Sequence, residues 1–298
     1  MCNLLARFHP WSSLLKAMVQ SNSNTRTAED YLQTDKVVGH QTAASHVRIY
    51  GKDSIGEYIV IVPSLGRGVE DYTEAYSSTL TTRLADAGYR VILIQPRGIG
   101  KSTGDLTPEI ASMSLFSNDI KCVLDALGIG RAHFIGHAFG NRLARTYATL
   151  YQDSVDRLVL MAAGGNFRMN EEQLDCVSNA LNLSLPDEER LKYIQRAFFA
   201  RANDASVWLQ GWYANLARAQ IMAAKMINGE FFKRAGGKPF LLIQAAEDFV
   251  APPDMAGRAL MTELGDQVSY VEIPETGHAL SSERPDVIAK HIINYFSE

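Results

Sequence analysis

The pentapeptide Gly136-His137-Ala138-Phe139-Gly140 has the spacing of a turn that presents a side chain for chemistry. It follows a short apolar run and precedes a segment with the apolar spacing of a helix. Glycines on either side of the central residue let a strand and a helix pass so closely that a Cβ atom would collide. This pattern predicts a nucleophile elbow, which exposes its central residue at the carboxyl edge of a sheet. Here that residue is Ala138, whose methyl group cannot attack a substrate.

The residues on either side of this turn alternate between short apolar runs and helical patterns. Such alternation is typical of a parallel sheet covered by helices, because strands buried on both faces read as continuous apolar runs. The expected strands span 45–50, 58–62, 91–94, 132–135, 158–161, 240–243 and 268–273. Helices are expected at 72–84, 113–127 and 254–264, directly after the turn, and at the end of the chain.

The alternation is interrupted between residues 166 and 236, where several helices and no convincing strand are predicted. Helix start signals stand at Pro186 and Asp204. We therefore expect a helical cap at 166–236, inserted after the strand at 158–161. The core domain would then consist of residues 36–165 and 237–298.

Composition argues against several classes of partner. Of the 298 residues, 46% are apolar and 21% are charged, and a formal net charge of −4 without a basic block argues against nucleic acid. No apolar run is long enough for a membrane span. Three scattered cysteines favour a reducing, cytoplasmic location. Residues 1–35 form an N-terminal extension, and residues 1–28 have the spacing of a short amphipathic helix. We expect a frayed or packed-back segment there, with a transit peptide or a membrane-surface helix as the alternatives. The oligomeric state is left open.

Four phrases, each weak alone, together resemble the α/β-hydrolase superfamily. They are Arg97-Gly98-Ile99-Gly100-Lys101-Ser102, the turn around Ala138, Ala245-Ala246-Glu247-Asp248 followed by Pro252, and Gly277-His278. The resemblance covers about residues 40–298. It implies an α/β protein with the α/β-hydrolase fold: a mostly parallel eight-stranded sheet with helices on both faces and an inserted helical cap.

The resemblance also implies catalytic roles. In a hydrolytic triad a histidine base deprotonates the attacking group, and an acid holds that histidine in one tautomer. By position, His278 is the base and Asp248 the acid, with Glu247 as an alternative because adjacent loop side chains cannot be ranked from sequence. Ala138 occupies the nucleophile position, which in this superfamily is usually serine.

An oxyanion hole needs two backbone N–H groups aimed at the developing negative charge. In this superfamily one would come from Phe139 and the other from the loop at 63–68, where Leu65 or Gly66 would donate. The family commonly has His-Gly where this chain has Ser64-Leu65, so this loop departs from the pattern.

Three explanations of Ala138 stay open. Alanine could have been introduced in place of serine to trap a complex. It could be native, since the sequence resembles a branch with alanine at this position. It could also mark decay into a binding module. If it is native, the attacking group would be Ser64, as a speculative nucleophile, or a water molecule activated by His278.

The predicted cap is rich in aromatic and flexible apolar side chains, among them Trp208 and Trp212. Most would pack the cap onto the sheet, and a minority would line an apolar substrate pocket. Arg67 and Arg97 lie on loops at the catalytic edge, where each would anchor a substrate carboxylate or form an ion pair.

The leading hypothesis is an enzyme that hydrolyses a carboxylic ester or lactone of a medium-sized apolar small molecule without cofactor. No metal-ligand spacing and no dinucleotide-binding fingerprint occurs in the sequence. Two alternatives remain: a lyase-type enzyme that uses His278 as base, and a catalytically inactive ligand-binding protein.

Overall fold

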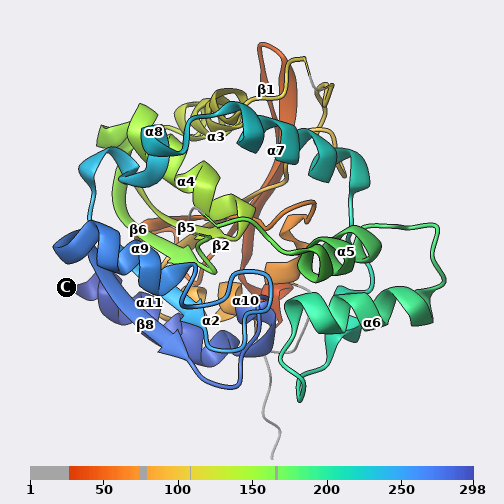
Figure 1. Ribbon diagram of the computed structural model, residues 1–298. Helices are drawn as coiled ribbons and strands as arrows, with labels where there is room; N and C mark the ends of the chain where they lie inside the picture. Colours follow the sequence, from red (N-terminus) through yellow and green to blue (C-terminus); the bar gives the residue numbers. More distant parts are fainter. Residues whose placement is uncertain (1–26, 74–78, 108, 165–166) are drawn as a thin grey trace, which may run out of the picture.

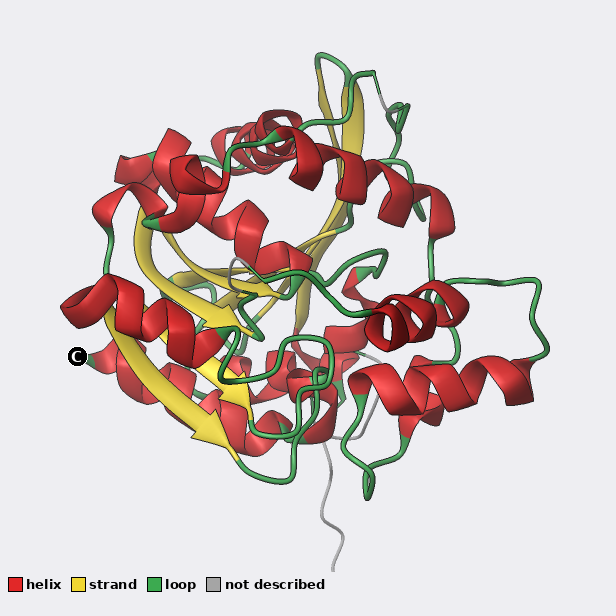
Figure 2. Ribbon diagram, in the orientation of Figure 1, coloured by secondary structure: helices red, strands yellow, loops and turns green. Residues whose placement is uncertain are grey.

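Eight strands form one sheet in a computed structural model that describes residues 27–73, 79–107, 109–164 and 167–298 (Figures 1 and 2). The strand order is β1-β2-β4-β3-β5-β6-β7-β8. Strand β2 runs antiparallel to both β1 and β4, and every other neighbouring pair is parallel. The strands are β1 (Leu32–His40), β2 (Ala43–Tyr50), β3 (Tyr58–Val62), β4 (Arg90–Ile94), β5 (Ala132–His137), β6 (Val155–Met161), β7 (Phe240–Ala245) and β8 (Val268–Ile273). The expected eight-stranded, mostly parallel sheet is confirmed.

Helices lie on both faces of this sheet (Figure 2). The α-helices are α2 (Leu80–Asp86), α3 (Met113–Ala126), α4 (Phe139–Leu150), α5 (Glu171–Ala180), α6 (Asp187–Phe198), α7 (Ala214–Met226), α8 (Gly229–Lys233), α9 (Gly257–Leu264), α10 (Leu280–Glu283) and α11 (Pro285–Ser297). Short 3-10 turns are η1 (Ala28–Tyr31), η2 (Val69–Tyr72), η3 (Gln152–Ser154), η4 (Ala205–Trp208), η5 (Ala235–Gly237) and η6 (Gly265–Gln267). None of the described helices is both long and apolar enough to cross a membrane.

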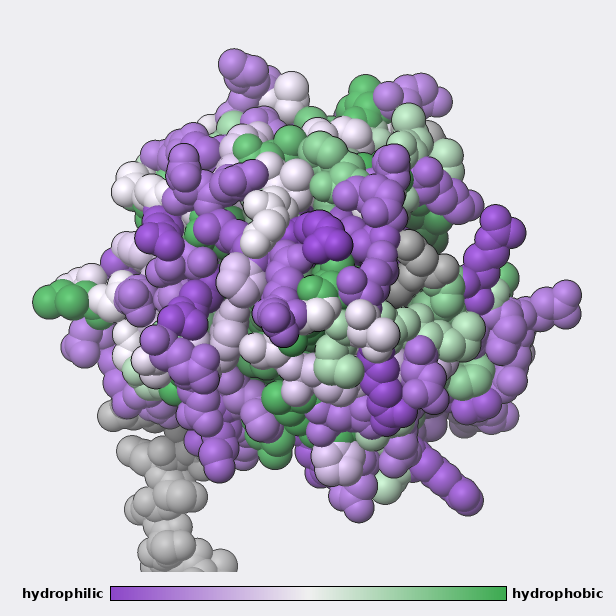
Figure 3. Space-filling view, turned by 60° about the vertical axis from the view of Figure 1, so that its left-hand side comes forward, coloured by the Kyte–Doolittle hydropathy of each residue, from purple (hydrophilic) through white to green (hydrophobic). Residues whose placement is uncertain are grey.

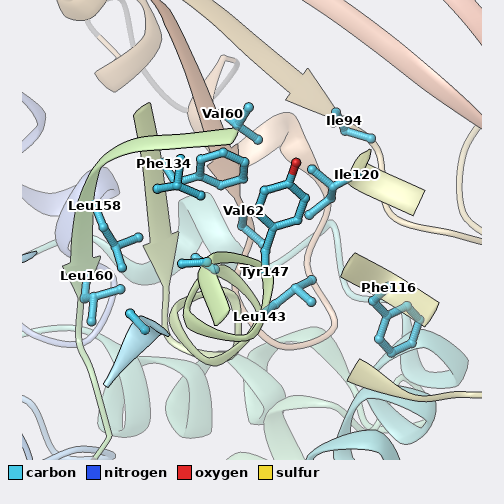
Figure 4. Close-up of a cluster of buried hydrophobic side chains, with 14 of the residues drawn as sticks. Val60, Val62, Ile94, Phe116, Ile120, Phe134, Leu143, Tyr147, Leu158 and Leu160 are labelled. Atoms are coloured by element: carbon cyan, nitrogen blue, oxygen red, sulfur yellow. The ribbon is translucent and has the colours of Figure 1, made fainter. Parts of the chain in front are cut away.

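Successive strand residues point to opposite faces, so the apolar runs supply two separate hydrophobic layers. On one face, Val60 and Phe134 pack with Tyr147 of α4 and Ile120 of α3 (Figure 4). On the other face, side chains such as Ile59 pack with α2 and α11. Each fully buried aliphatic side chain contributes about 1.5–3 kcal/mol. The two layers therefore fix the carboxyl edge at which the loops gather.

The segment predicted as a cap contains helices and no strand among its described residues. Helices α5 and α6 pack with η4 in one hydrophobic cluster. Phe198 and Trp208 belong to this cluster. Helix α7 is different, because Ala219 and Ala223 belong to the layer formed by α3 and α4. Figure 1 accordingly shows α7 beside α3, whereas α5 and α6 lie together at the other end of the segment.

The beginning of the chain differs from the prediction. The strand expected first, at 45–50, is the second one, because β1 starts at Leu32, inside the predicted extension. Polar residues interrupt this edge strand, so it lacks the continuous apolar run of a buried strand. The expected helix at 72–84 is also wrong: η2 ends at Tyr72 and α2 starts at Leu80, with 74–78 outside the described residues. Nearly all of the amphipathic segment at 1–28 lies outside them too.

The face of the molecule drawn in Figure 3 is mainly hydrophilic, and its apolar side chains gather in small separate groups. This distribution is ordinary for a folded surface. The groups that could do chemistry are therefore sought inside the fold, where the loops at the carboxyl edge meet the segment between β6 and β7.

Candidate active site

Ala138 forms a one-residue turn between β5 and α4. Its backbone has φ 52° and ψ −110°, a conformation that residues with a Cβ atom rarely adopt. The Ala138 N–H donates to the Met161 carbonyl at 3.0 Å, and the Asn141 N–H donates to the Ala138 carbonyl at 3.1 Å. Bonds to the neighbouring strand and to the helix hold the turn in this strained form.

The glycines on either side are required by close backbone contacts. A Cβ atom on Gly136 would lie 2.5 Å from the Gly140 carbonyl oxygen. A Cβ atom on Gly140 would lie 2.1 Å from the Val62 carbonyl oxygen. Both distances are far below van der Waals contact, so the predicted reason for these glycines agrees with the geometry.

Asp248 and His278 meet at the same edge, from the loops after β7 and β8. The His278 Nδ1 atom lies 2.9 Å from Asp248 Oδ2 and 3.0 Å from Oδ1, and both side chains are buried. Asp248 Oδ1 also accepts from the Ala251 N–H at 2.7 Å. Glu247, the sequence alternative, is exposed, so Asp248 is the carboxylate that orients this histidine.

His137 joins the elbow to the loop that carries His278. Its Nε2–H donates to the His278 carbonyl at 2.7 Å, and the Tyr72 hydroxyl donates to its Nδ1 at 3.1 Å. Burial, together with the nearby His278, lowers the pKa of His137 from 6.5 to about 3. A neutral His137 therefore fixes the backbone of the residue expected to act as base.

Ala138 and His278 face one cavity of about 670 Å³. Its wall also includes Ser64, Leu65 and Phe139, and the Trp212 side chain contributes from the predicted cap. The remaining lining is mainly apolar, as in most small-molecule sites. The nucleophile position, the histidine and the alternative nucleophile Ser64 are thus brought together in one wall.

Only part of the predicted oxyanion loop is available to a substrate. The Gly66 N–H donates to Gln220 Oε1 of α7 at 2.7 Å, so Gly66 is not a free donor. Among the described residues, the N–H groups of Leu65 and Phe139 have no protein acceptor. Leu65 and Phe139 therefore remain the candidate pair of donors, and sequence could not have revealed the competing Gln220 contact.

Arg67 does not reach the cavity. The residue is 1% exposed, and its guanidinium contacts the rings of both Trp208 and Trp212, at 4.6 and 4.5 Å from their centroids. Its Nε donates to Asp71 Oδ2 at 2.8 Å, and Nη1 donates to the Gln210 carbonyl at 2.7 Å. The prediction of Arg67 as a substrate contact is therefore wrong, because its guanidinium is already engaged.

Two other predicted contacts are also structural. Trp208 is fully buried, and its Nε1–H donates to Ser282 Oγ at 2.9 Å, so it does not line the cavity as expected. Arg97 is buried and forms an ion pair with Asp119 at 2.6 Å. Arg142, which no sequence motif indicated, also lines the cavity, from the second turn of α4.

One further cluster lies at the opposite, amino edge of the sheet, where Glu57, His133 and Asp156 approach one another. The two His133 nitrogens face different carboxylates, Nε2 toward Glu57 at 3.4 Å and Nδ1 toward Asp156 at 3.9 Å. Each residue offers one ligand atom to this group, but Glu57 is exposed, and exposed acidic groups are common without a metal ion, so we assign no role to the cluster.

Comparison with known proteins supports the fold described above. Residues 58–197 match the family model described as the alpha/beta hydrolase fold. An enol-lactonase from Burkholderia xenovorans LB400 superposes with a TM-score of 0.71 at 20% identity, covering 88% of this chain and all of that one. A meta-cleavage product hydrolase gives a TM-score of 0.70 at 23% identity, over 88% and 97% of the two chains.

The chain has the α/β-hydrolase fold. In sequence it is similar to a 2-hydroxy-6-oxononadienedioate/2-hydroxy-6-oxononatrienedioate hydrolase of Paraburkholderia phymatum, with 34% identity over 133 residues. That match spans 44% of this chain and 45% of the relative. A hydrolase of the same name from a Pseudomonas species is 24% identical over 279 residues, which cover 88% of this chain and 95% of the relative.

A Gly140→Ala substitution should destabilise this α/β-hydrolase fold by more than about 3 kcal/mol, because the new methyl group would collide with the Val62 carbonyl. Urea unfolding measures the difference. Gly130→Ala is the matched control, since no atom lies within 4 Å of the position of its Cβ. Equal stability of the two variants would contradict the close approach of β5 and α4.

The neutral state of His137 predicts a pH dependence of stability. The unfolded chain binds a proton at this residue below about pH 6.5, whereas the folded chain does so only near pH 3. The free energy of unfolding should therefore fall by up to about 1.4 kcal/mol per pH unit between these limits. Urea titrations between pH 7 and 5 should show this slope reduced in His137→Gln. His291→Gln should keep the wild-type slope; an unchanged slope in His137→Gln would refute the assignment.

Proposed function

We propose that this α/β-hydrolase-fold protein hydrolyses a carboxylic ester or lactone of a medium-sized, mainly apolar substrate in the cavity beside Ala138. The observation that carries the proposal is the His278–Asp248 pair, whose histidine faces the same cavity as the elbow. The names of similar proteins, an enol-lactonase and dienedioate hydrolases, support hydrolysis as the reaction class. Residues 166–236 would act as the cap over this cavity.

In the proposed mechanism a water molecule takes the place of the missing nucleophile. Asp248 accepts from the His278 Nδ1–H and so leaves Nε2 as the base. Among the described residues, Nε2 has no hydrogen-bond partner. It removes a proton from water while the water oxygen attacks the substrate carbonyl carbon. The carbonyl oxygen becomes negatively charged, and the Leu65 and Phe139 N–H groups stabilise it.

The tetrahedral intermediate then collapses. The bond between carbon and the leaving alkoxide breaks, and the protonated His278 gives its proton to that oxygen. Asp248 stabilises the imidazolium between the two proton transfers. The products are a carboxylic acid and an alcohol, or a hydroxy acid when the substrate is a lactone. Water is consumed once, and the histidine returns to its neutral form.

Ser64 offers a second way to supply an attacking group. Ser64 lines the cavity and is 3% exposed. Its hydroxyl has no protein hydrogen-bond partner among the described residues. A Ser64 nucleophile would need His278 within reach of Oγ and would give an acyl-enzyme, whereas the water mechanism gives none.

Ala138 itself favours one alternative function, a ligand-binding protein that keeps the cavity and does no chemistry. The elbow and the histidine would then be inherited geometry, since fold alone does not determine activity. A lyase that uses His278 on a carbon acid would likewise need no nucleophile. Turnover distinguishes these possibilities.

Turnover of a panel of aryl esters and medium-ring lactones should be detectable with the chain as it stands and should fall at least about 100-fold in His278→Ala. Ser64→Ala should stay within about threefold if water attacks. Ala138→Ser restores a nucleophile and should add a burst of acyl-enzyme. Activity confined to Ala138→Ser would refute native hydrolysis, and ligand binding without turnover would favour the binding protein.

Asp248→Asn should lower kcat by at least about 100-fold with little change in KM, because the amide no longer holds the reactive tautomer of His278. Glu247→Gln is the matched control, as it removes the adjacent but exposed carboxylate. Equal kcat values for the two variants would remove Asp248 from the mechanism.

A further inference from the structure

Helix α4 carries two arginines, Arg142 and Arg145, shortly after the elbow. Arg142 is four residues after Ala138, so the two residues lie one helical turn apart on the same face of the helix. Helical side chains lean toward the N-terminus, which directs Arg142 back toward the elbow. A Cβ atom on Gly164, in the loop after β6, would lie 3.7 Å from Arg142 Nη2. The guanidinium is thus placed beside the carboxyl ends of β5 and β6, in the wall of the main cavity.

Arg145 lies one turn further along α4 and is almost completely buried. Its Nη2 donates to Asn141 Oδ1 at 2.8 Å, and its guanidinium lies 5.0 Å from the centre of the Phe232 ring. Burial, together with the neighbouring Arg142, lowers the pKa of Arg145 to about 9, so this group stays mainly protonated at neutral pH. Burial also lowers the pKa of Arg142.

Neither arginine has an acidic partner. Among the described residues, no carboxylate lies within 4 Å of the nitrogens of either guanidinium group. The residues outside the description include a single acid, Glu74. Two neighbouring buried cations without a counterion are unfavourable, because each loses hydration and repels the other. An anion bound between the elbow and these arginines would remove that cost.

The charges around the cavity have the same sign. Arg168 and Lys225 also line it, both are exposed, and no acidic residue of the described ranges contributes to its wall. A second cavity of about 450 Å³ shares Arg142 with the first and is lined by Arg145. Lys233 lies there too, but it is neutralised by ion pairs with Glu230 and Glu263. The unpaired positive charge is therefore concentrated on the side that faces Ala138.

We propose that Arg142, supported by Arg145, binds a carboxylate group of the substrate, so that the ester or lactone cleaved beside Ala138 is itself an anion. The cleavage of the bound anion rests on the proposed function, whereas the binding of its carboxylate does not. One planar guanidinium in an apolar wall suits the two oxygens of a carboxylate, whereas a phosphate dianion needs more donors. The helical spacing places the Cβ atoms of Arg142 and Ala138 about 5–6 Å apart, so a carboxylate bound by Arg142 would lie near the elbow. Arg168 and Lys225 would attract the anion to the cavity mouth.

Binding can be tested without turnover by calorimetric titration with 4-phenylbutanoate and its neutral isostere 4-phenylbutanamide. We expect the wild-type chain to bind the carboxylate at least tenfold more tightly than the amide. Arg142→Met should reduce that ratio to below about twofold, and Arg142→Lys should restore part of it. The exposed Arg218 of α7 gives the matched control, because Arg218→Met removes the same charge outside the cavity wall and should keep the ratio.

The outcomes separate this inference from the proposed hydrolysis. His278→Ala should keep the tenfold preference for carboxylate even where all turnover is lost, so an inactive chain that still prefers carboxylate supports the anion site alone. Equal affinity for acid and amide in the wild type would overturn the inference. The inference would also be overturned if the preference for carboxylate persisted in an Arg142→Met variant whose urea unfolding matches that of the wild type. Inorganic phosphate that competes at lower concentration than the carboxylate would also overturn it, since the site would then select phosphate.

Discussion

The close passage of β5 and α4 around Ala138 is the constraint on which the rest of the site depends. Gly140 lies against the backbone of β3, and Gly136 lies against the first turn of α4, so neither position tolerates a Cβ atom. This contact brings the N-terminus of α4 to the carboxyl edge of the sheet, beside the loop after β3. Leu65, Phe139 and Arg142 all line one cavity at this edge.

Buried polar links then connect this edge to loops far away in the sequence. His137 binds the backbone of His278, and Asp248 binds its ring. Glu283 accepts from the Gly277 N–H at 2.9 Å and from the Ala200 N–H at 2.9 Å, which joins the histidine loop to the end of α6. Removing one partner of such a link leaves a buried polar group unsatisfied, which costs about 1–3 kcal/mol. The site is therefore held by the same contacts that hold the predicted cap.

The sequence was most informative where a local rule has only one structural solution. The glycine spacing around Ala138 predicted a turn that the structure contains, and the apolar runs at 58–62 and 268–273 coincide with β3 and β8. It was least informative where long-range pairing decides. The edge strand β1 is stabilised by its pairing with β2 despite its polar residues. Nothing near Arg67 in the sequence indicated that its guanidinium contacts two tryptophan rings some 140 residues away.

Retention of the elbow without its nucleophile has a physical interpretation. A residue with a Cβ atom at φ 52° and ψ −110° costs about 1–3 kcal/mol of strain. The methyl group of Ala138 does no chemistry that would account for this strain. The position that the turn gives to the neighbouring backbone does account for it. The turn places Phe139 and Arg142 in the wall of the cavity. Neither position depends on a serine side chain at the elbow, which is consistent with the anion site and the water mechanism that we propose.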